Sequence, residues 1–144
     1  MEHYSQKQCH LALLTATDII NTRTKACPTY TRGTNDCVAL LAEYDRALRG
    51  GKTKAHLKFE WISVRDFIVK LRRAGYTMPE YMKRCGYEIV TNNKPKTGDV
   101  AFEQGAMIAG LSGWISTTNE GVAEKRQMMF LERRLSFIAR PIRS

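Results

Sequence analysis

The sequence predicts one α+β domain in which N-terminal helices pack on a small antiparallel sheet formed by the C-terminal half of the chain. Apolar residues recur at the helical spacing of three and four up to about residue 86, and short apolar runs separated by turn residues come after them. A run of helices followed by a run of strands favours an arrangement in which the helices form one layer and the strands another. The length of 144 residues suits a single domain that buries a core without disulfides or metal.

Two helices are predicted in the first fifty residues. The first spans 4–20 and is followed by an irregular, Thr-rich stretch over 21–34. The second spans about 36–48, because polar capping residues precede it and Gly50-Gly51 ends it. We expect this second helix to pack against the sheet built from 97–118.

Two capping boxes open two further helices. The first box, Ser63–Asp66, precedes the clearest amphipathic helix of the chain, which Gly75 ends. The second box, Thr77–Glu80, has a proline in the first turn and opens a short helix to about Cys85.

From residue 87 onward the pattern is that of short strands separated by turns. Strands are predicted at 87–90, 100–103, 106–111, 114–117 and 135–141, with a helical turn at about 127–133. Because Pro141 lacks a backbone N–H, we expect the last strand to lie at an edge of the sheet.

Composition narrows the classes of partner. The chain carries 23 Lys and Arg against 14 Asp and Glu, a formal charge of +9, which favours contact with polyanions or with an acidic protein neighbour. The four cysteines lack the spacing of a zinc site, and no apolar run approaches the roughly 20 residues that cross a bilayer. We therefore expect reduced thiols, no metal, no cofactor and no membrane span.

Cys37 is the candidate catalytic residue. It falls in the first turn of the second helix, where backbone N–H groups favour a thiolate and can hold an oxyanion, with Asn35 and Asp36 as supporting residues. Cys37 also shares a helical face with Leu41 and Tyr44, so it can instead be a small buried core residue. The second interpretation is the one we favour.

Two segments resemble a known family. The run Gly33-Thr-Asn-Asp-Cys-Val-Ala-Leu-Leu-Ala-Glu-Tyr44 resembles the nucleophile segment of NlpC-type, papain-like cell-wall peptidases, and Thr97-Gly-Asp-Val-Ala-Phe102 resembles the Gly-Asp-Leu-Val-Phe strand that comes next there. The stretch from 33 to about 141 looks most like a phage-associated domain of unknown function in that superfamily. The resemblance implies an NlpC-like α+β domain over 31–144 and an N-terminal helical extension over 1–30.

The resemblance also indicates what is missing. In active members a histidine opens the strand after the Gly-Asp motif and accepts the thiol proton. Here that strand reads Gly105-Ala-Met-Ile-Ala-Gly-Leu111, without a histidine. The chain has three histidines, His3, His10 and His56, and of these His10 and His56 are the candidates for a base brought in by folding.

Three functions are compatible with these patterns, of which the first is preferred. It is a non-enzymatic phage virion protein, such as a tail, connector or internal component, located in the host cytoplasm before assembly and partnered by other virion subunits. Contact with DNA or peptidoglycan and homo-oligomer formation also remain open. The alternative is an active cysteine hydrolase that degrades peptidoglycan during phage entry. A second alternative, resting on charge alone, is a basic nucleic-acid-binding protein.

Overall fold

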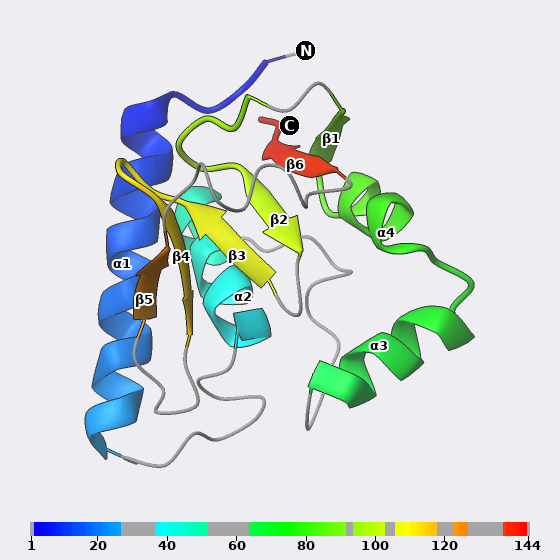
Figure 1. Cartoon of the computed structure of the whole chain (residues 1–144), viewed down its shortest axis with the longest axis horizontal. Coiled ribbons are helices and arrows are strands. Elements are labelled where there is room, and N and C mark those ends of the chain that lie inside the picture. The colour runs from blue at the N-terminus through cyan, green and yellow to red at the C-terminus, as the bar shows by residue number, and fades with distance from the viewer. Residues whose placement is uncertain are drawn as a thin grey trace.

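A computed structural model describes residues 2–26, 37–51, 64–91, 94–102, 106–117, 123–126 and 137–143, with the backbone alone for 64–67 and 123–126. Four helices come first: α1 (Gln6–Ala26), α2 (Cys37–Leu48), α3 (Val64–Arg73) and α4 (Met78–Arg84) (Figure 1). Six strands come after them: β1 (Tyr87–Val90), β2 (Val100–Phe102), β3 (Ala106–Ala109), β4 (Trp114–Thr117), β5 (Ala123–Arg126) and β6 (Ile138–Pro141). The predicted α+β class, with helices packed on an antiparallel sheet, is confirmed.

The six strands form one sheet in the order β1-β6-β2-β3-β4-β5, and every neighbouring pair is antiparallel. The C-terminal strand β6 is therefore internal, and its predicted place at an edge is wrong. Its pairing with β2 is limited to Ala139 opposite Val100, whereas Pro141 is the last residue of the strand and pairs with Tyr87 of β1. Proline is tolerated because it lies beyond the short ladder with β2.

The end of one helix and the presence of one strand also differ from the prediction. Helix α1 continues to Ala26, although 21–34 was expected to be irregular. Ile20 is buried in the core, and the Thr24 hydroxyl donates to the Ile20 carbonyl, so the Thr-rich residues 21–26 satisfy this hydroxyl within the helix. Strand β5 was not predicted, and the helical turn expected at 127–133 lies outside the described residues.

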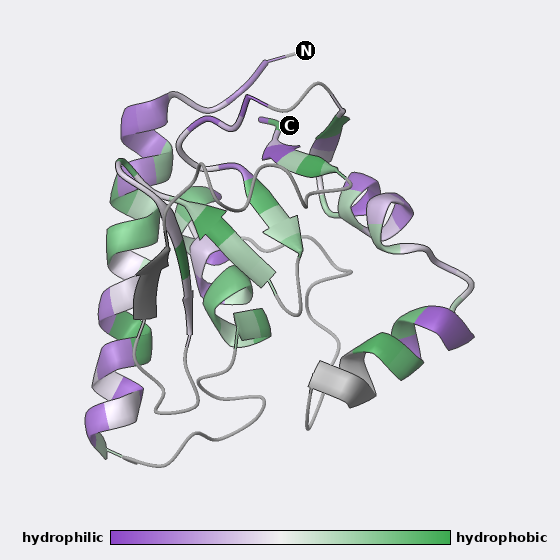
Figure 2. Cartoon of the chain, in the orientation of Figure 1, coloured by the Kyte–Doolittle hydropathy of each residue, from purple (hydrophilic) through white to green (hydrophobic). Residues whose placement is uncertain are grey.

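Helix α2 is the centre of the core. It packs against α1 and against β3 and β4, and Figure 2 shows apolar residues along this helix and along β2 and β3. Its buried residues occupy all sides of the helix: Cys37, Val38, Ala39, Leu40, Leu41, Ala42, Glu43, Tyr44, Asp45 and Leu48. A helix buried all round must pair any charge that it carries.

Helix α1 shares this core. Its buried residues recur at the helical spacing and join the cluster that contains α2: Cys9, Ala12, Leu13, Ala16 and Ile20. Residues 6–26 are thus packed on the sheet-bearing part of the chain through α2.

Both carboxylates of α2 have cationic partners. Glu43 accepts hydrogen bonds from Arg46 and, at 3.1 Å, from Arg23 of α1. Asp45, which is fully buried, accepts from Nε of Arg49 at 2.8 Å and from the hydroxyl of Tyr87 at 2.9 Å. The two pairs fix α2 against α1 and against β1.

Arg49 extends the second pair to other segments. Its guanidinium donates to the carbonyl oxygens of Cys85, Gly86 and Ile142. It also lies over the ring of Tyr4, 5.8 Å from the ring centre. One buried cation therefore joins the end of α2 to the turn before β1 and to both ends of the chain.

Replacing Arg49 with alanine should lower the free energy of unfolding by about 3–5 kcal/mol, because the carboxylate of Asp45 would remain buried without its cation. The matched control is Arg46→Ala, on the same helix, whose side chain is 48% exposed against 5% for Arg49. The control should cost less than Arg49→Ala, because Glu43 keeps Arg23 as its cationic partner. Urea denaturation followed by circular dichroism measures both, and equal losses would contradict the role assigned to Arg49.

Burial also raises the pKa of several groups that are neutral at pH 7. For Cys85 burial raises the pKa to about 12. The pKa values of a second thiol and of three phenols are raised by the same cause: Cys9, Tyr44, Tyr81 and Tyr87. A group whose pKa is raised by folding stabilises the fold fully below its unfolded pKa and loses that contribution as the pH rises.

The contribution of these groups to the free energy of unfolding should therefore fall above about pH 9 for the two thiols and above about pH 10 for the three phenols, by about 1.4 kcal/mol per pH unit for each group. Urea denaturation at a series of pH values between 7 and 11 measures this slope. The Cys85→Ala variant should show a shallower fall, since it lacks one of the groups. Identical slopes in the two proteins would show that Cys85 ionises as readily in the folded state as in the unfolded state.

Candidate functional site

Cys37 is the first residue of α2, and its side chain points at the sheet. The residue is 8% exposed, and its sulfur accepts a hydrogen bond from the backbone N–H of Ala106 at 3.4 Å. Ala106 is the first residue of β3, a strand inside the sheet. The structure thus places the head of the helix against the start of the strand that comes after the Gly-Asp motif.

Gly105, with which the compared segment begins, lies outside the described residues, and Ala106 is the first described residue of that segment. Its side chain is a buried methyl group, and its carbonyl accepts a hydrogen bond from the Ser116 hydroxyl of β4 at 3.0 Å. The described polar side chains that bind the backbone of Ala106 are therefore the thiol of Cys37 and the hydroxyl of Ser116. Neither of these two groups accepts a proton readily at neutral pH.

The two described histidines lie at the other end of α2. His3 contacts Glu88 of β1, with 2.6 Å between Nε2 and Oε2. His10 is next to Cys9, whose side chain packs against Gly98. The carbonyl of Gly98 is bonded to Tyr44, which is seven residues after Cys37 and so about 10 Å further along α2. His10 is not brought to Cys37, and His56, Asn35 and Asp36 lie outside the described residues.

The glycine of the Gly-Asp motif is required by packing. Gly98 has a φ of 98°, and a Cβ atom there would lie 2.4 Å from Cβ of Cys9. The Tyr44 hydroxyl donates to the Gly98 carbonyl at 2.8 Å, so α1 and α2 both contact this turn. The close approach of the two helices explains why this position carries no side chain.

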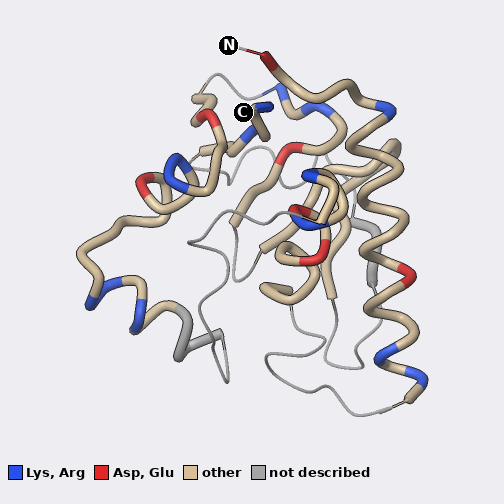
Figure 3. The backbone as a smooth tube through the Cα atoms, turned by 180° about the vertical axis from the view of Figure 1, so that it is seen from behind, with Lys and Arg blue, Asp and Glu red and all other residues tan. Residues whose placement is uncertain are grey.

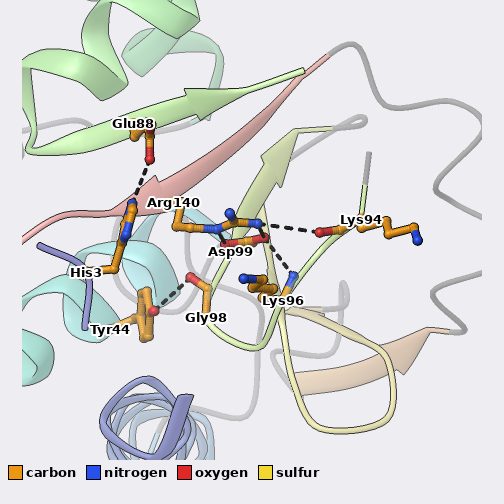
Figure 4. A network of polar contacts seen from close by, with 8 residues as sticks. All are labelled: His3, Tyr44, Glu88, Lys94, Lys96, Gly98, Asp99 and Arg140. Atoms are coloured by element: carbon orange, nitrogen blue, oxygen red, sulfur yellow. Dashed lines mark hydrogen bonds and ion pairs between the residues drawn. The ribbon is translucent and has the colours of Figure 1, made fainter. Parts of the chain in front are cut away.

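The aspartate of the motif shapes the turn and anchors β6. Asp99 is buried, and its Oδ2 accepts from the backbone N–H of Lys96 at 2.7 Å (Figure 4). Arg140 donates to both carboxylate oxygens at 2.9 Å. These contacts raise the pKa of Arg140, with the hydrogen bonds to Asp99 as the main cause. The arrangement fits a structural role for Asp99.

The sequence did not indicate two of the ion pairs that hold the site in place. Arg140 lies 41 positions after Asp99, and nothing in the spacing marks the two as partners. Arg49 and Asp45 are four positions apart, a common helical pair, so their burial could not be inferred from the pattern. A prediction that α2 is buried on all sides would have implied a cationic partner for Asp45.

Basic side chains are spread over the outer elements. Figure 3 shows them on α3, on α4 and at the end of α1. The exposed members are Lys25, Lys70, Arg72, Arg73, Lys83 and Arg84.

Comparison of the chain with protein-family models, with curated proteins and with solved structures gives no match. Among the described helices, none is both long and apolar enough to traverse a bilayer. Across the same residues no three His, Cys, Asp or Glu side chains gather as a metal site requires. Any function has to be argued from the residues around Cys37 and from the exposed surface.

Proposed function

We propose that this chain is a non-enzymatic bacteriophage virion protein built on a degenerate NlpC-like, papain-like frame. The observation that carries the proposal is the contact between the Cys37 sulfur and the backbone N–H of Ala106. A helix headed by cysteine meets the start of the strand after a Gly-Asp motif, as in the cysteine peptidases that the sequence resembles. The residue that opens that strand is alanine.

Hydrolysis by a cysteine needs more than a thiol. A base must take the thiol proton, and an acid must protonate the leaving amine. The sulfur of Cys37 is buried, and the described histidines lie at the opposite end of α2. The described histidines, His3 and His10, are therefore not in position to exchange a proton with this sulfur, and the described contact of Cys37 packs α2 on the sheet.

The exterior suits an assembly role. With a formal charge of +9 the protein is attracted to packaged DNA or to acidic faces of neighbouring subunits. The exposed basic residues of α3 and α4 lie outside the core that holds α2, so a partner can reach them without disturbing the fold. Other virion subunits are the partners of this proposal, and self-association is compatible with it.

Purified phage particles should contain this protein at a stoichiometric level, because a structural subunit is retained through purification. Quantitative mass spectrometry of gradient-purified particles measures its copy number against a known capsid or tail subunit. Detection in the lysate together with loss from the particles would contradict the proposal.

An active hydrolase remains the second candidate, because Cys37 does lie at the head of a helix beside a central strand. The proposal predicts that wild type and Cys37→Ala release equal, background amounts of soluble muropeptides from purified cell-wall sacculi. Chromatography of the supernatant measures the release. Release by wild type that disappears in Cys37→Ala would establish the hydrolase instead.

A further inference from the structure

Two leucines are exposed side by side on the outer face of α1. Leu11 is 52% exposed and Leu14 is 49% exposed, and they are two of the three large apolar side chains that are exposed among the described residues. Figure 1 shows α1 at the border of the molecule, with α2 and the sheet on its inner side. Single exposed leucines are common, whereas adjacent ones on one helix face favour packing against another protein.

Opposite charges flank the two leucines on the same face of the helix. Lys7 lies four residues before Leu11, and Asp18 lies four residues after Leu14. Spacings of four, three and four residues keep the side chains in one stripe, as at the a and d positions of a coiled coil. Both charged side chains are exposed, and neither has an ion-pair partner among the described residues. The stripe therefore runs from a cation through two leucines to an anion.

We propose that this stripe packs against the same stripe of a second copy of the chain, with the two α1 helices antiparallel. A two-fold axis that passes between Leu11 and Leu14 places Leu11 of each copy against Leu14 of the partner subunit. The same axis places Lys7 of each copy against Asp18 of the partner subunit, so the interface contains two ion pairs. The stripe is thus complementary to itself, with an apolar centre and opposite charges at its two ends.

Charge also fixes the orientation and the identity of the partner. In a parallel pair of helices, Lys7 would face a second lysine and Asp18 would face a second aspartate, and both contacts would be repulsive. The antiparallel pair makes the contacts at both ends attractive. Because the stripe complements itself rather than one sign of charge, a second copy of this chain is the partner that it fits.

The dimer is weak, because the paired part of α1 is short. The helical residues that face each other are 6–19, about four turns. Such a contact buries less than the roughly 800 Å² per partner of a stable complex. The formal charge of +9 also makes the two copies repel each other. We therefore expect a dissociation constant in the micromolar range or above at physiological salt.

Sedimentation equilibrium of the full chain between about 5 and 500 µM measures this dissociation constant. Lys7→Glu and Asp18→Lys should each raise it by about tenfold, because each variant turns two attractive contacts into two repulsive ones. Overall charge does not predict this result, since the first variant removes two units of positive charge and the second adds two. Lys83→Glu, at an exposed position of α4, is the matched control and should not weaken association.

An equimolar mixture of the Lys7→Glu and Asp18→Lys variants should associate as wild type does, because the acidic side chains of one variant then face the lysines of the other. A wild type that stays monomeric at every concentration would overturn the proposal. Shifts of the two single variants in opposite directions would overturn it too, as would a mixture that associates no better than either variant alone. The interface uses neither Cys37 nor the basic residues of α3 and α4, so none of these results bears on the virion proposal.

Discussion

Burial of α2 on every side is the constraint on which the other contacts depend. A helix enclosed by α1, β3 and β4 leaves no solvent for the carboxylates of Glu43 and Asp45. Each therefore has a cationic partner, and the partners reach other segments. Arg23 brings in α1, and Arg49 brings in the turn before β1 and the C-terminal residues. Pairing of two buried charges thus joins segments that are far apart in the sequence.

The same burial decides the chemistry at the head of α2. The Cys37 sulfur lies at the start of β3 and accepts a hydrogen bond from the backbone N–H of Ala106. Gly98 and Asp99, which lie in the segment that resembles a hydrolase motif, both make packing contacts here: Gly98 allows the close approach of α1, and Asp99 forms an ion pair with Arg140 of β6. The contacts of Gly98 and Asp99 are thus contacts that stabilise the packing of α1 and β6.

The local pattern predicted most elements, because each is short and ends at a marked residue. Gly50 and Gly51, both with positive φ, end α2, and the Thr77 hydroxyl caps α4. Neighbours along the sheet were harder to predict. Pro141 indicated that β6 lies at an edge of the sheet, but β6 lies inside it. The proline does not prevent this, because the pairing of β6 with β2 is limited to Ala139. Contacts between distant residues, such as Asp99 with Arg140, leave no periodic signal in the sequence.

The proposal of a non-enzymatic frame depends on the sulfur of Cys37 having no imidazole beside it among the described residues, and substitution of Ala106 tests it most directly. Ala106→His places a base beside the Cys37 sulfur, and Ala106→Leu is the control for added bulk, with circular dichroism to verify folding. We predict that iodoacetamide alkylates Cys37 about tenfold faster at pH 7 in the histidine variant than in wild type or the leucine variant, as followed on the Cys37 peptide by mass spectrometry. A folded histidine variant with the wild-type rate would contradict the account.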